Sequence, residues 1–177
     1  MEYLDVVNDK DEVVGKELKI LCHKNDLMHR GSGILVFKDN HLDAILLQKR
    51  SRSVRQDPGL WCNPGGHVQS GESYETAAKR ECQEELFSKN SLPLDFFQTS
   101  HLKHIFTFFK NQPFDREFIA VFQMIYQGPF SPLEDEVEQL QFFHMSEIGK
   151  NLLTHPEIYT FTFQKIFNLY QKNTKKG

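Results

Sequence analysis

The most informative segment of this chain reads Gly65-Gly66-His67-Val68-Gln69-Ser70-Gly71-Glu72 and continues, after Lys79, as Arg80-Glu81-Cys82-Gln83-Glu84-Glu85. It has the form of a glycine loop followed by an acidic helix, which we expect over residues 73–87. On that helix Glu81 and Glu85 lie one turn apart, about 6 Å along the axis, with Glu84 beside them. Like charges at this spacing repel by roughly a few tenths of a kcal/mol per pair, so the helix itself gains nothing from them. A bound hard cation would explain the arrangement.

Length and composition limit the kind of molecule to which this helix belongs. The chain has 177 residues, of which 39% are hydrophobic and 25% are charged. A chain of this size and composition folds as one compact domain with a sizeable core. No internal repeat, linker or low-complexity block interrupts the sequence. We therefore expect a single domain over residues 1–173, followed by a solvated basic tail at residues 174–177.

Charge and cysteine content exclude several partners and compartments. The formal net charge is -3 and the isoelectric point is near 6.2, so the chain as a whole attracts neither nucleic acid nor an anionic membrane, and we expect neither as a partner. No run of residues approaches the ~20 apolar positions of a membrane span. Cys22, Cys62 and Cys82 are too far apart for a zinc knuckle, and their odd number argues against a secreted disulfide framework. We expect a soluble protein in the reducing cytoplasm.

Alternating apolar patterns predict a mixed sheet. The expected strands are a hairpin at 3–14, packed on the edge of the sheet, and residues 32–37, 43–48, 102–109, 118–126 and 140–145. Further helices are expected at 17–25, after a cap at Ser146, and at 156–170. A mixed, mainly antiparallel sheet with a helix on each face, an α/β sandwich, is the most economical arrangement. The aromatic side chains of the last helix belong either to the core or to a dimer surface, so both a monomer and a homodimer remain open.

A basic run follows the second central strand in an otherwise acidic chain. It reads Lys49-Arg50-Ser51-Arg52-Ser53-Val54-Arg55. Such runs are usually solvated loops. This one lies between a core strand and the acidic helix, and guanidinium groups bind phosphate oxygens through two parallel hydrogen bonds. Arg50, Arg52 and Arg55 are therefore candidates for substrate binding.

The glycine loop and acidic helix together resemble the Nudix box, whose pattern is G-x5-E-x7-R-E-U-x-E-E-x-G-U with U aliphatic. Gly66, Glu72 and the run from Arg80 to Glu85 match its spacing throughout. Phe87 replaces the last glycine and Ser88 the closing aliphatic residue, so both departures lie past the acidic positions. A match of this length is far more specific than a lone glycine motif. It implies the Nudix-type α/β/α sandwich.

The resemblance also implies a metal site on the acidic helix. Glu81, Glu84 and Glu85 would hold Mg²⁺, with Mn²⁺ as the alternative, and the carbonyl of Gly65 would be a further ligand. Either Glu81 or Glu84 would take the proton from the attacking water, because the choice of base varies within the family.

Other residues are expected to support this site. An ion pair between Glu72 and Arg80 would brace the loop against the helix next to Gly66. The acidic stretch from Glu134 to Glu138 lies where some Nudix enzymes supply an extra carboxylate, and Glu136 is our candidate, although a solvated loop is the simpler interpretation. We interpret as ordinary surface or core residues the histidines without metal-binding spacing, which are His67, His101, His104 and His144.

The N-terminal half is also similar to one branch of the Nudix family, the isopentenyl diphosphate isomerases. The similarity rests on Tyr3 to Asn8, His29-Arg30, Gln48 to Arg50 and Gly59-Leu60-Trp61. Those isomerases protonate an alkene with a loop cysteine, and Gly66 stands at the matching position here. His29 resembles one of that branch's metal-binding histidines, whereas Val68 occupies the place of another.

Hydrolysis of a diphosphate linkage is therefore the leading functional hypothesis. A diphosphate is anionic and repels an attacking hydroxide, so its hydrolysis needs a divalent metal ion. The expected substrate is a small molecule, a nucleoside di- or triphosphate or another nucleoside diphosphate derivative, with water attacking phosphorus. Two alternatives are an isomerase-like enzyme and a catalytically silent nucleotide-binding module. A silent module has no need of three mutually repelling carboxylates.

Overall fold

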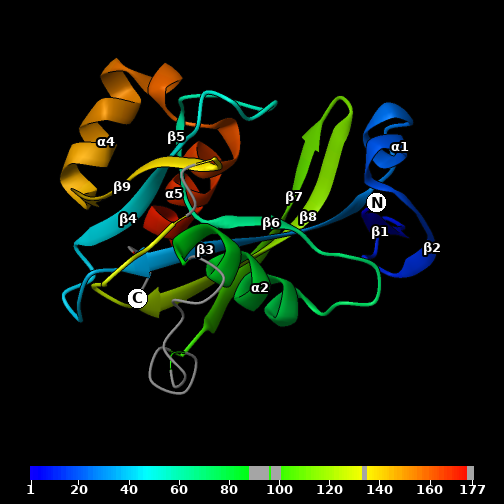
Figure 1. The fold of residues 1–177 in the computed structure, drawn as a ribbon, viewed down its shortest axis with the longest axis horizontal. Helices are drawn as coiled ribbons and strands as arrows, with labels where there is room; N and C mark the ends of the chain where they lie inside the picture. Colours follow the sequence, from blue (N-terminus) through cyan, green and yellow to red (C-terminus); the bar gives the residue numbers. More distant parts are fainter. Residues whose placement is uncertain (88–95, 97–100, 133–134, 175–177) are drawn as a thin grey trace.

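The structure of the protein is a computed structural model that describes residues 1–87, 96, 101–132 and 135–174 (Figure 1). Residue Ser88, which departs from the Nudix box, and all but the first residue of the expected basic tail at 174–177 lie outside the described residues. The strands are β1 (Tyr3–Val7), β2 (Val13–Leu18), β3 (His29–Phe37), β4 (Ala44–Arg50), β5 (Trp61–Cys62), β6 (Gly65–His67), β7 (Lys103–Gln112), β8 (Asp115–Ile125) and β9 (Val137–His144). The α-helices are α1 (Lys19–Lys24), α2 (Tyr74–Leu86), α4 (Met145–Thr154) and α5 (Phe161–Thr174). None of these described helices is long and apolar enough to cross a membrane.

The large sheet is mixed and mainly antiparallel, which confirms the prediction. Its strand order is β5-β4-β3-β8-β7, with β6 paired to β3 and β9 paired to β4. Among the described strands, β3 and β8 form the one parallel pair. The neighbours β3 and β4 pair at Val36 and Phe37, whereas residues 31–33 of β3 pair with residues 65–67 of β6. The sheet is therefore split beside the first half of β3, and the glycine loop lies in that split.

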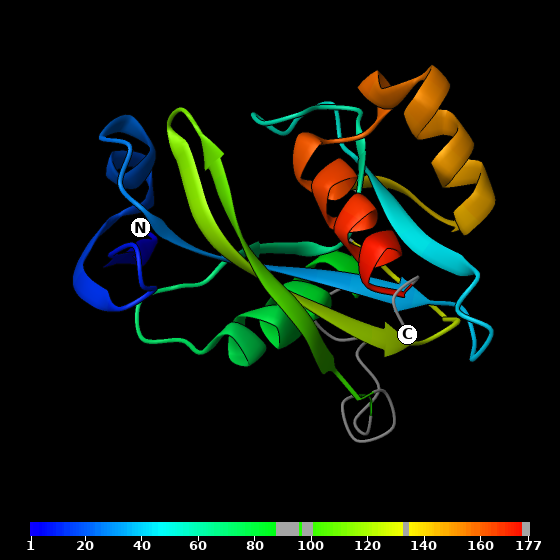
Figure 2. The same ribbon diagram turned by 180° about the vertical axis from the view of Figure 1, so that it is seen from behind.

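Helices cover both faces of the sheet. Successive residues of β3 point to opposite faces. Ile34 and Val36 pack under α2, while Leu35 and Phe37 pack against α5, and all four side chains are fully buried. Figures 1 and 2 show α2 on one face of the sheet and α5 on the other. This arrangement is the α/β/α sandwich that the sequence predicted.

The N-terminal hairpin forms a two-stranded sheet of its own instead of extending the edge of the large sheet. Asp11, in the turn between β1 and β2, accepts hydrogen bonds from Arg30 (2.6 Å) and from the Tyr74 hydroxyl (2.9 Å). Beyond α1, the carboxylate of Asp26 accepts the backbone N–H of Phe114 at 2.7 Å. The contacts of Asp11 tie the hairpin to β3 and α2, and the contact of Asp26 holds the end of α1 beside the turn between β7 and β8.

Two helix starts differ from the prediction. Helix α4 is capped by His144 and not by Ser146. Nδ1 of His144 accepts the backbone N–H of Ser146 at 3.3 Å. Residues Pro156–Ile158 form a separate 3-10 turn. The long helix α5 starts after it, where the Thr160 hydroxyl accepts the backbone N–H of Phe163 at 3.3 Å. Side-chain acceptors at these positions satisfy the otherwise unpaired N–H groups of a first turn.

Two phenylalanines near the start of α5 test how the helix is held. Phe163 is fully buried and Phe161 is 43% exposed. Phe163→Ala should lower the free energy of unfolding by about 3–5 kcal/mol because it leaves a cavity. Phe161→Ala, the matched control, should change it by less than about 1 kcal/mol. Urea denaturation of both variants measures the difference, and equal effects would contradict the packing of α5 on the sheet.

Candidate active site

The glycine loop is fitted so closely to its surroundings that side chains are excluded. Gly65 has φ +144°, a conformation that suits glycine alone, and a Cβ atom there would lie 2.2 Å from the carbonyl oxygen of Ser32. A Cβ atom on Gly66 would lie 2.5 Å from the carboxyl group of Glu81. The loop therefore lies directly against both β3 and α2.

Helix α2 presents two of its carboxylates to this loop. The hydroxyl of Ser73 accepts the backbone N–H of Thr76 at 3.1 Å and caps the helix. The buried side of α2 faces the sheet through Cys82, so Glu81 and Glu85 lie on the flank next to the loop. The backbone N–H of Gly65 donates to Glu85 Oε2 at 2.7 Å.

Arg80 joins the loop to the helix. Its guanidinium makes the expected ion pair with Glu72, through two hydrogen bonds of 2.9 Å. It also donates to Glu81 Oε1 at 2.7 Å, to Glu84 Oε2 at 3.1 Å and to the carbonyl oxygen of His67 at 2.9 Å. The hydrogen bonds that Arg80 donates to Glu72, followed by the one to Glu81, outweigh burial and raise the pKa of Arg80, so the side chain is a permanent cation. One arginine thus orients a pocket carboxylate and the end of β6 together.

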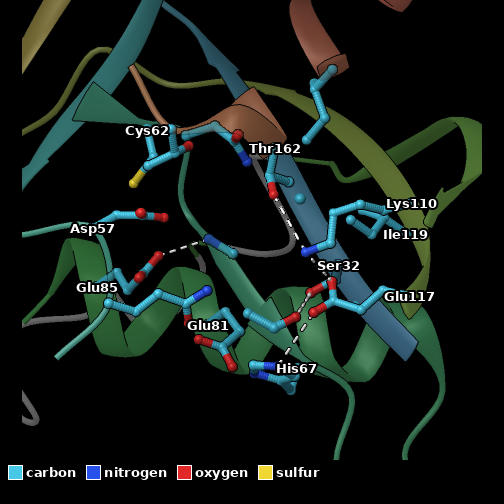
Figure 3. A pocket seen from close by; sticks show the side chains of 18 of the residues that line it. Ser32, Asp57, Cys62, His67, Glu81, Glu85, Lys110, Glu117, Ile119 and Thr162 are labelled. Atoms are coloured by element: carbon cyan, nitrogen blue, oxygen red, sulfur yellow. Dashed lines mark hydrogen bonds and ion pairs between the residues drawn. The ribbon is translucent and has the colours of Figure 1, made fainter. Parts of the chain in front are cut away.

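A pocket of about 260 Å³ lies between α2 and the glycine loop on one side and strands β7 and β8 on the other (Figure 3). In Figure 3, Glu81 and Glu85 project from α2 on one side, and Lys110 and Glu117 lie on the other side. Thr162, near the start of α5, lies above them. Besides Lys110, two cationic side chains line the pocket, and these are Lys19 and Arg50.

The pocket gathers part of the residue set predicted from the sequence. Gly65, Gly66, Glu81, Glu85 and Arg50 line it. Among the described residues, the lining leaves out the other predicted positions, which are Glu72, Arg80, Glu84, Arg52, Arg55 and Glu136. The side chain of Glu84 is 54% exposed and that of Arg52 is 84% exposed. Arg55 and Glu136 are also exposed.

The two pocket carboxylates of α2 form an electrostatically costly pair. Burial, followed by repulsion from Glu81, raises the pKa of Glu85 to about 8. Burial also raises the pKa of Glu81, against the opposing effect of Arg80. A divalent cation between the two would relieve this cost, and carboxylate oxygens next to a loop carbonyl are the ligands that Mg²⁺ prefers. The residues present therefore fit a hard metal ion.

A second group of potential ligands lies where α1, β3, β6 and β8 meet. The ligand atoms of His23, His29 and His67 lie within 4.8 Å of one another, as do those of His29, Asp115 and Glu117. The Nε2 atoms of His23 and His67 are 3.2 Å apart. Glu117 Oε1 is 3.3 Å from His29 Nε2 and 3.4 Å from His67 Nε2. His67 and Glu117 also line the pocket, so this group borders the same space as Glu81.

These separations match the edges of a metal coordination shell. Ligands about 2.1 Å from an ion are about 3.0 Å apart in an octahedron and about 3.4 Å apart in a tetrahedron. Nδ1 of His23 lies 2.9 Å from the carbonyl oxygen of Phe114, and Nδ1 of His29 lies 2.9 Å from that of Leu27. An Nδ1–H bound to a carbonyl leaves Nε2 free to coordinate. Three imidazoles and one carboxylate suit a transition-metal ion better than Mg²⁺.

The charge of Glu117 supports this interpretation. Burial opposes its ionisation, but hydrogen bonds with His29 and His67 and the charge of Lys110 outweigh burial. Together they hold the pKa of Glu117 well below its usual value. Burial lowers the pKa of His29, but its hydrogen bond with Glu117 outweighs burial and raises that pKa, so a metal ion would take the place of a proton on this imidazole.

Sequence reasoning did not find this group. It treated His67 as an ordinary histidine and gave His23, Asp115 and Glu117 no role. Asp115 and Glu117 alternate along β8, so they share a face of the sheet. That signal was present in the sequence, but their histidine partners come from α1, β3 and β6. The grouping therefore depends on the parallel pairing of β3 with β8, which places His29 opposite Glu117.

Comparison with known proteins gives a consistent result. The NUDIX domain family model matches residues 27–164. The isopentenyl-diphosphate delta-isomerase 2 of Photorhabdus laumondii is 31% identical over 170 residues, which cover 94% of this chain and 91% of that protein. An uncharacterised Nudix hydrolase of Pseudomonas aeruginosa is 29% identical over 142 residues, 80% of this chain and 78% of its own length. The crystal structure of DR0079 from Deinococcus radiodurans matches with a TM-score of 0.74 and 20% identity, covering 94% of this chain and 98% of that chain, and shows likeness of fold.

The close approach of Gly66 to Glu81 can be tested with a single methyl group. Gly66→Ala should push the Glu81 carboxyl aside and weaken Mg²⁺ binding by about tenfold or more. Gly15→Ala is the matched control, because a Cβ atom at Gly15 meets no heavy atom within 4 Å. Isothermal titration with Mg²⁺ measures both variants. Unchanged affinity in Gly66→Ala would contradict a metal ligand role for Glu81.

The raised pKa of Glu85 predicts how the stability of the folded protein changes with pH. The folded protein holds the Glu85 proton up to a pKa of about 8, whereas the ordinary value is 4.5. The folded state therefore binds more protons than the unfolded state between these values, and stability should fall as pH rises from about 4.5 to about 8. Glu85→Gln should remove this decline and raise the melting temperature above pH 8. Metal-free melting curves across this pH range measure the difference, and parallel curves for the two proteins would contradict it.

Proposed function

The chain belongs to the Nudix family, and from this premise we propose that it is a divalent-metal-dependent hydrolase. It cleaves a diphosphate linkage in a nucleoside di- or triphosphate, or in another nucleoside diphosphate derivative, by attack of water on phosphorus. The observation that carries the proposal is the convergence of Glu81 and Glu85 on one pocket beside the glycine loop. A diphosphate is the substrate class that needs such a site, because its own charge repels a nucleophile.

Glu81, Glu85 and the carbonyl of Gly65 would hold the metal, which we propose to be Mg²⁺ or Mn²⁺. When bound, the metal ion screens the phosphate oxygens and lowers the pKa of water. The N–H of Gly65 keeps Glu85 Oε2 at a fixed position, and Arg80 does the same for Glu81 Oε1. Two fixed oxygens on adjacent helical turns reduce the reorganisation that ligand binding requires.

Glu81 is also our candidate for the base that accepts the proton of water. Its Oε1 is held by Arg80, and its side chain lines the pocket. Burial raises its pKa, which brings it toward the range in which a carboxylate accepts protons at neutral pH. Glu84 remains a proposed ligand and alternative base. Its Oε2 is paired with Arg80 and half of its side chain faces solvent, so we rank it after Glu81.

Cationic side chains would receive the phosphate groups from two directions. Arg50 lies near Glu85, and its charge lowers the pKa of that carboxyl. Lys19 acts in the same way on Glu81. A diphosphate lying over both carboxylates would therefore meet a cation at each end. Arg52 and Arg55, which are exposed, are proposed to contact parts of the substrate that extend outside the pocket, and Glu136 remains a proposed extra carboxylate.

A second candidate function is isomerisation of an isoprenoid diphosphate, and the histidine group His23, His29 and His67 favours it. The relative from Photorhabdus bears that activity in its name. The glycine loop has no thiol. Cys62 lines the pocket, but burial raises its pKa to about 12, which makes this thiol a weak acid. An effective general acid has a pKa near the working pH. We rank this function second because the Cys62 thiol sits on β5 and not on the loop.

The cysteines and the pocket also suggest a cellular compartment and a partner for the proposed enzyme. Cys22, Cys62 and Cys82 are all free and buried, which suits a reducing compartment such as the cytoplasm. The partner is a small diphosphate, and neither nucleic acid nor membrane is expected. The protein would act as a monomer or a homodimer.

Enzyme assays with single variants test the hydrolase. The protein should release phosphate or a nucleotide product from at least one member of a panel of nucleoside di- and triphosphates, nucleotide sugars and dinucleotides, and only with Mg²⁺ or Mn²⁺. Glu81→Gln and Glu85→Gln should each lower kcat/KM by about 100-fold or more because each removes a charged ligand. Glu75→Gln, on the exposed side of α2 in an ion pair with Lys79, is the control and should keep full activity.

Three outcomes would decide against this proposal. Metal-independent release, or full activity in both pocket variants, would refute the metal-dependent mechanism. Conversion of isopentenyl diphosphate to dimethylallyl diphosphate, with no hydrolysis of any panel member, would favour the second candidate, and Cys62→Ser would then show whether that thiol is the acid.

A further inference from the structure

A buried lysine lies in the wall of the pocket opposite α2. Lys110, on β7, is paired across the hairpin with Glu117 on β8. Its side chain is 4% exposed. Its ammonium lies 2.7 Å from Asp115 Oδ2 and 3.3 Å from Glu117 Oε2, and it donates to the Thr162 hydroxyl at 3.5 Å (Figure 3). A buried ammonium is costly unless it is paired, and here both of its anionic partners lie beside the histidine group.

The contacts of the Lys110 ammonium show whether it is available to bind substrate. An ammonium has three N–H donors and no acceptor. Lys110 donates hydrogen bonds to Asp115 and Thr162, and its ammonium also forms an ion pair with Glu117 Oε2. Binding a phosphate oxygen would require Lys110 to give up one of these partners. Its contacts therefore suit a fixed internal cation better than a substrate ligand.

The two acids held by Lys110 could otherwise take a cation themselves. The ligand atoms of His29, Asp115 and Glu117 lie within 4.8 Å of one another, in a set that shares His29 with the three-histidine set. Asp115 Oδ1 is buried and has no hydrogen-bond partner among the described residues. Two carboxylates and an imidazole without Lys110 would leave excess negative charge in a buried place.

The two carboxylate oxygens of Glu117 face different partners, and Lys110 holds one of them. Oε2 faces the Lys110 ammonium, at 3.3 Å. Oε1 faces His29 and His67, at 3.3 and 3.4 Å. Rotating the carboxylate to offer both oxygens to the histidines would break its ion pair with Lys110. The lysine therefore restricts Glu117 to a single oxygen on the histidine side.

We propose that Lys110 is a positioning residue that replaces a second divalent ion at Asp115 and Glu117 and turns Glu117 Oε1 toward the three histidines. The histidine group then takes one metal ion and no more. The ammonium also cancels negative charge in a pocket that must admit an anionic diphosphate. This inference rests on metal binding by the proposed enzyme and not on its hydrolysis of any substrate.

Counting bound metal tests the inference without an activity assay. Equilibrium dialysis against Mn²⁺, with elemental analysis, gives the ions bound per folded chain. Lys110→Met keeps the length of the side chain and removes its charge, so it should bind about one additional Mn²⁺ per chain at the freed carboxylates. Lys110→Arg keeps the charge and should bind as many ions as the unchanged protein. Lys49→Met is the matched control, because Lys49 is also on a strand in an ion pair, with Glu138.

Further variants separate this role from a merely structural one. Lys110→Met combined with Asp115→Asn removes one of the freed carboxylates and should return the Mn²⁺ count to that of the unchanged protein. If Lys110→Met is unfolded without metal, Mn²⁺ should restore its folded circular dichroism spectrum. The inference is overturned if folded Lys110→Met binds no extra ion, or if the variant stays unfolded at saturating Mn²⁺. A failed hydrolase assay alone leaves the metal count unaffected, so the two failures are distinguishable.

Discussion

The structure depends on a contact between backbone and carboxylate, in which strand β6 lies so close to α2 that no Cβ atom fits between them. Gly66 touches the carboxyl group of Glu81, and the N–H of Gly65 holds Glu85. Because the strand is also paired with β3, the position of the helix relative to the sheet is set at this point. Two acidic groups are thereby buried together at an electrostatic cost that a bound cation would offset.

The split in the sheet provides the space for that cation. The pairing of β3 with β4 is confined to Val36 and Phe37, and the first half of β3 is left to β6 and β8. Apolar packing on both faces keeps the two halves of the sheet together. The pocket thus lies beside a continuous core, where the surrounding side chains have little freedom to move.

The predictable part of this molecule is the part encoded locally. Glu81, Glu84 and Glu85 share one helix, so their spacing alone revealed a crowded acidic surface. The apolar run at 32–37 and the alternation at 118–126 likewise predicted two strands of the sheet. Which carboxylates reach the pocket depends on the rotation of α2, which the burial of Cys82 sets. The histidine group escaped prediction because four elements meet to form it. Arg52 was predicted from its charge and from its place between a core strand and the acidic helix, and neither distinguishes a pocket wall from an exposed loop.

The position of α1 shows that residues before the matched family domain contribute to the pocket. The family model starts at residue 27, yet Lys19 lines the pocket and His23 belongs to the histidine group, and both precede that boundary. The hairpin formed by β1 and β2, which looks peripheral in Figure 1, carries the helix that supplies them. Trimming the chain to its recognisable domain would therefore keep the sandwich and open one wall of its active centre to solvent.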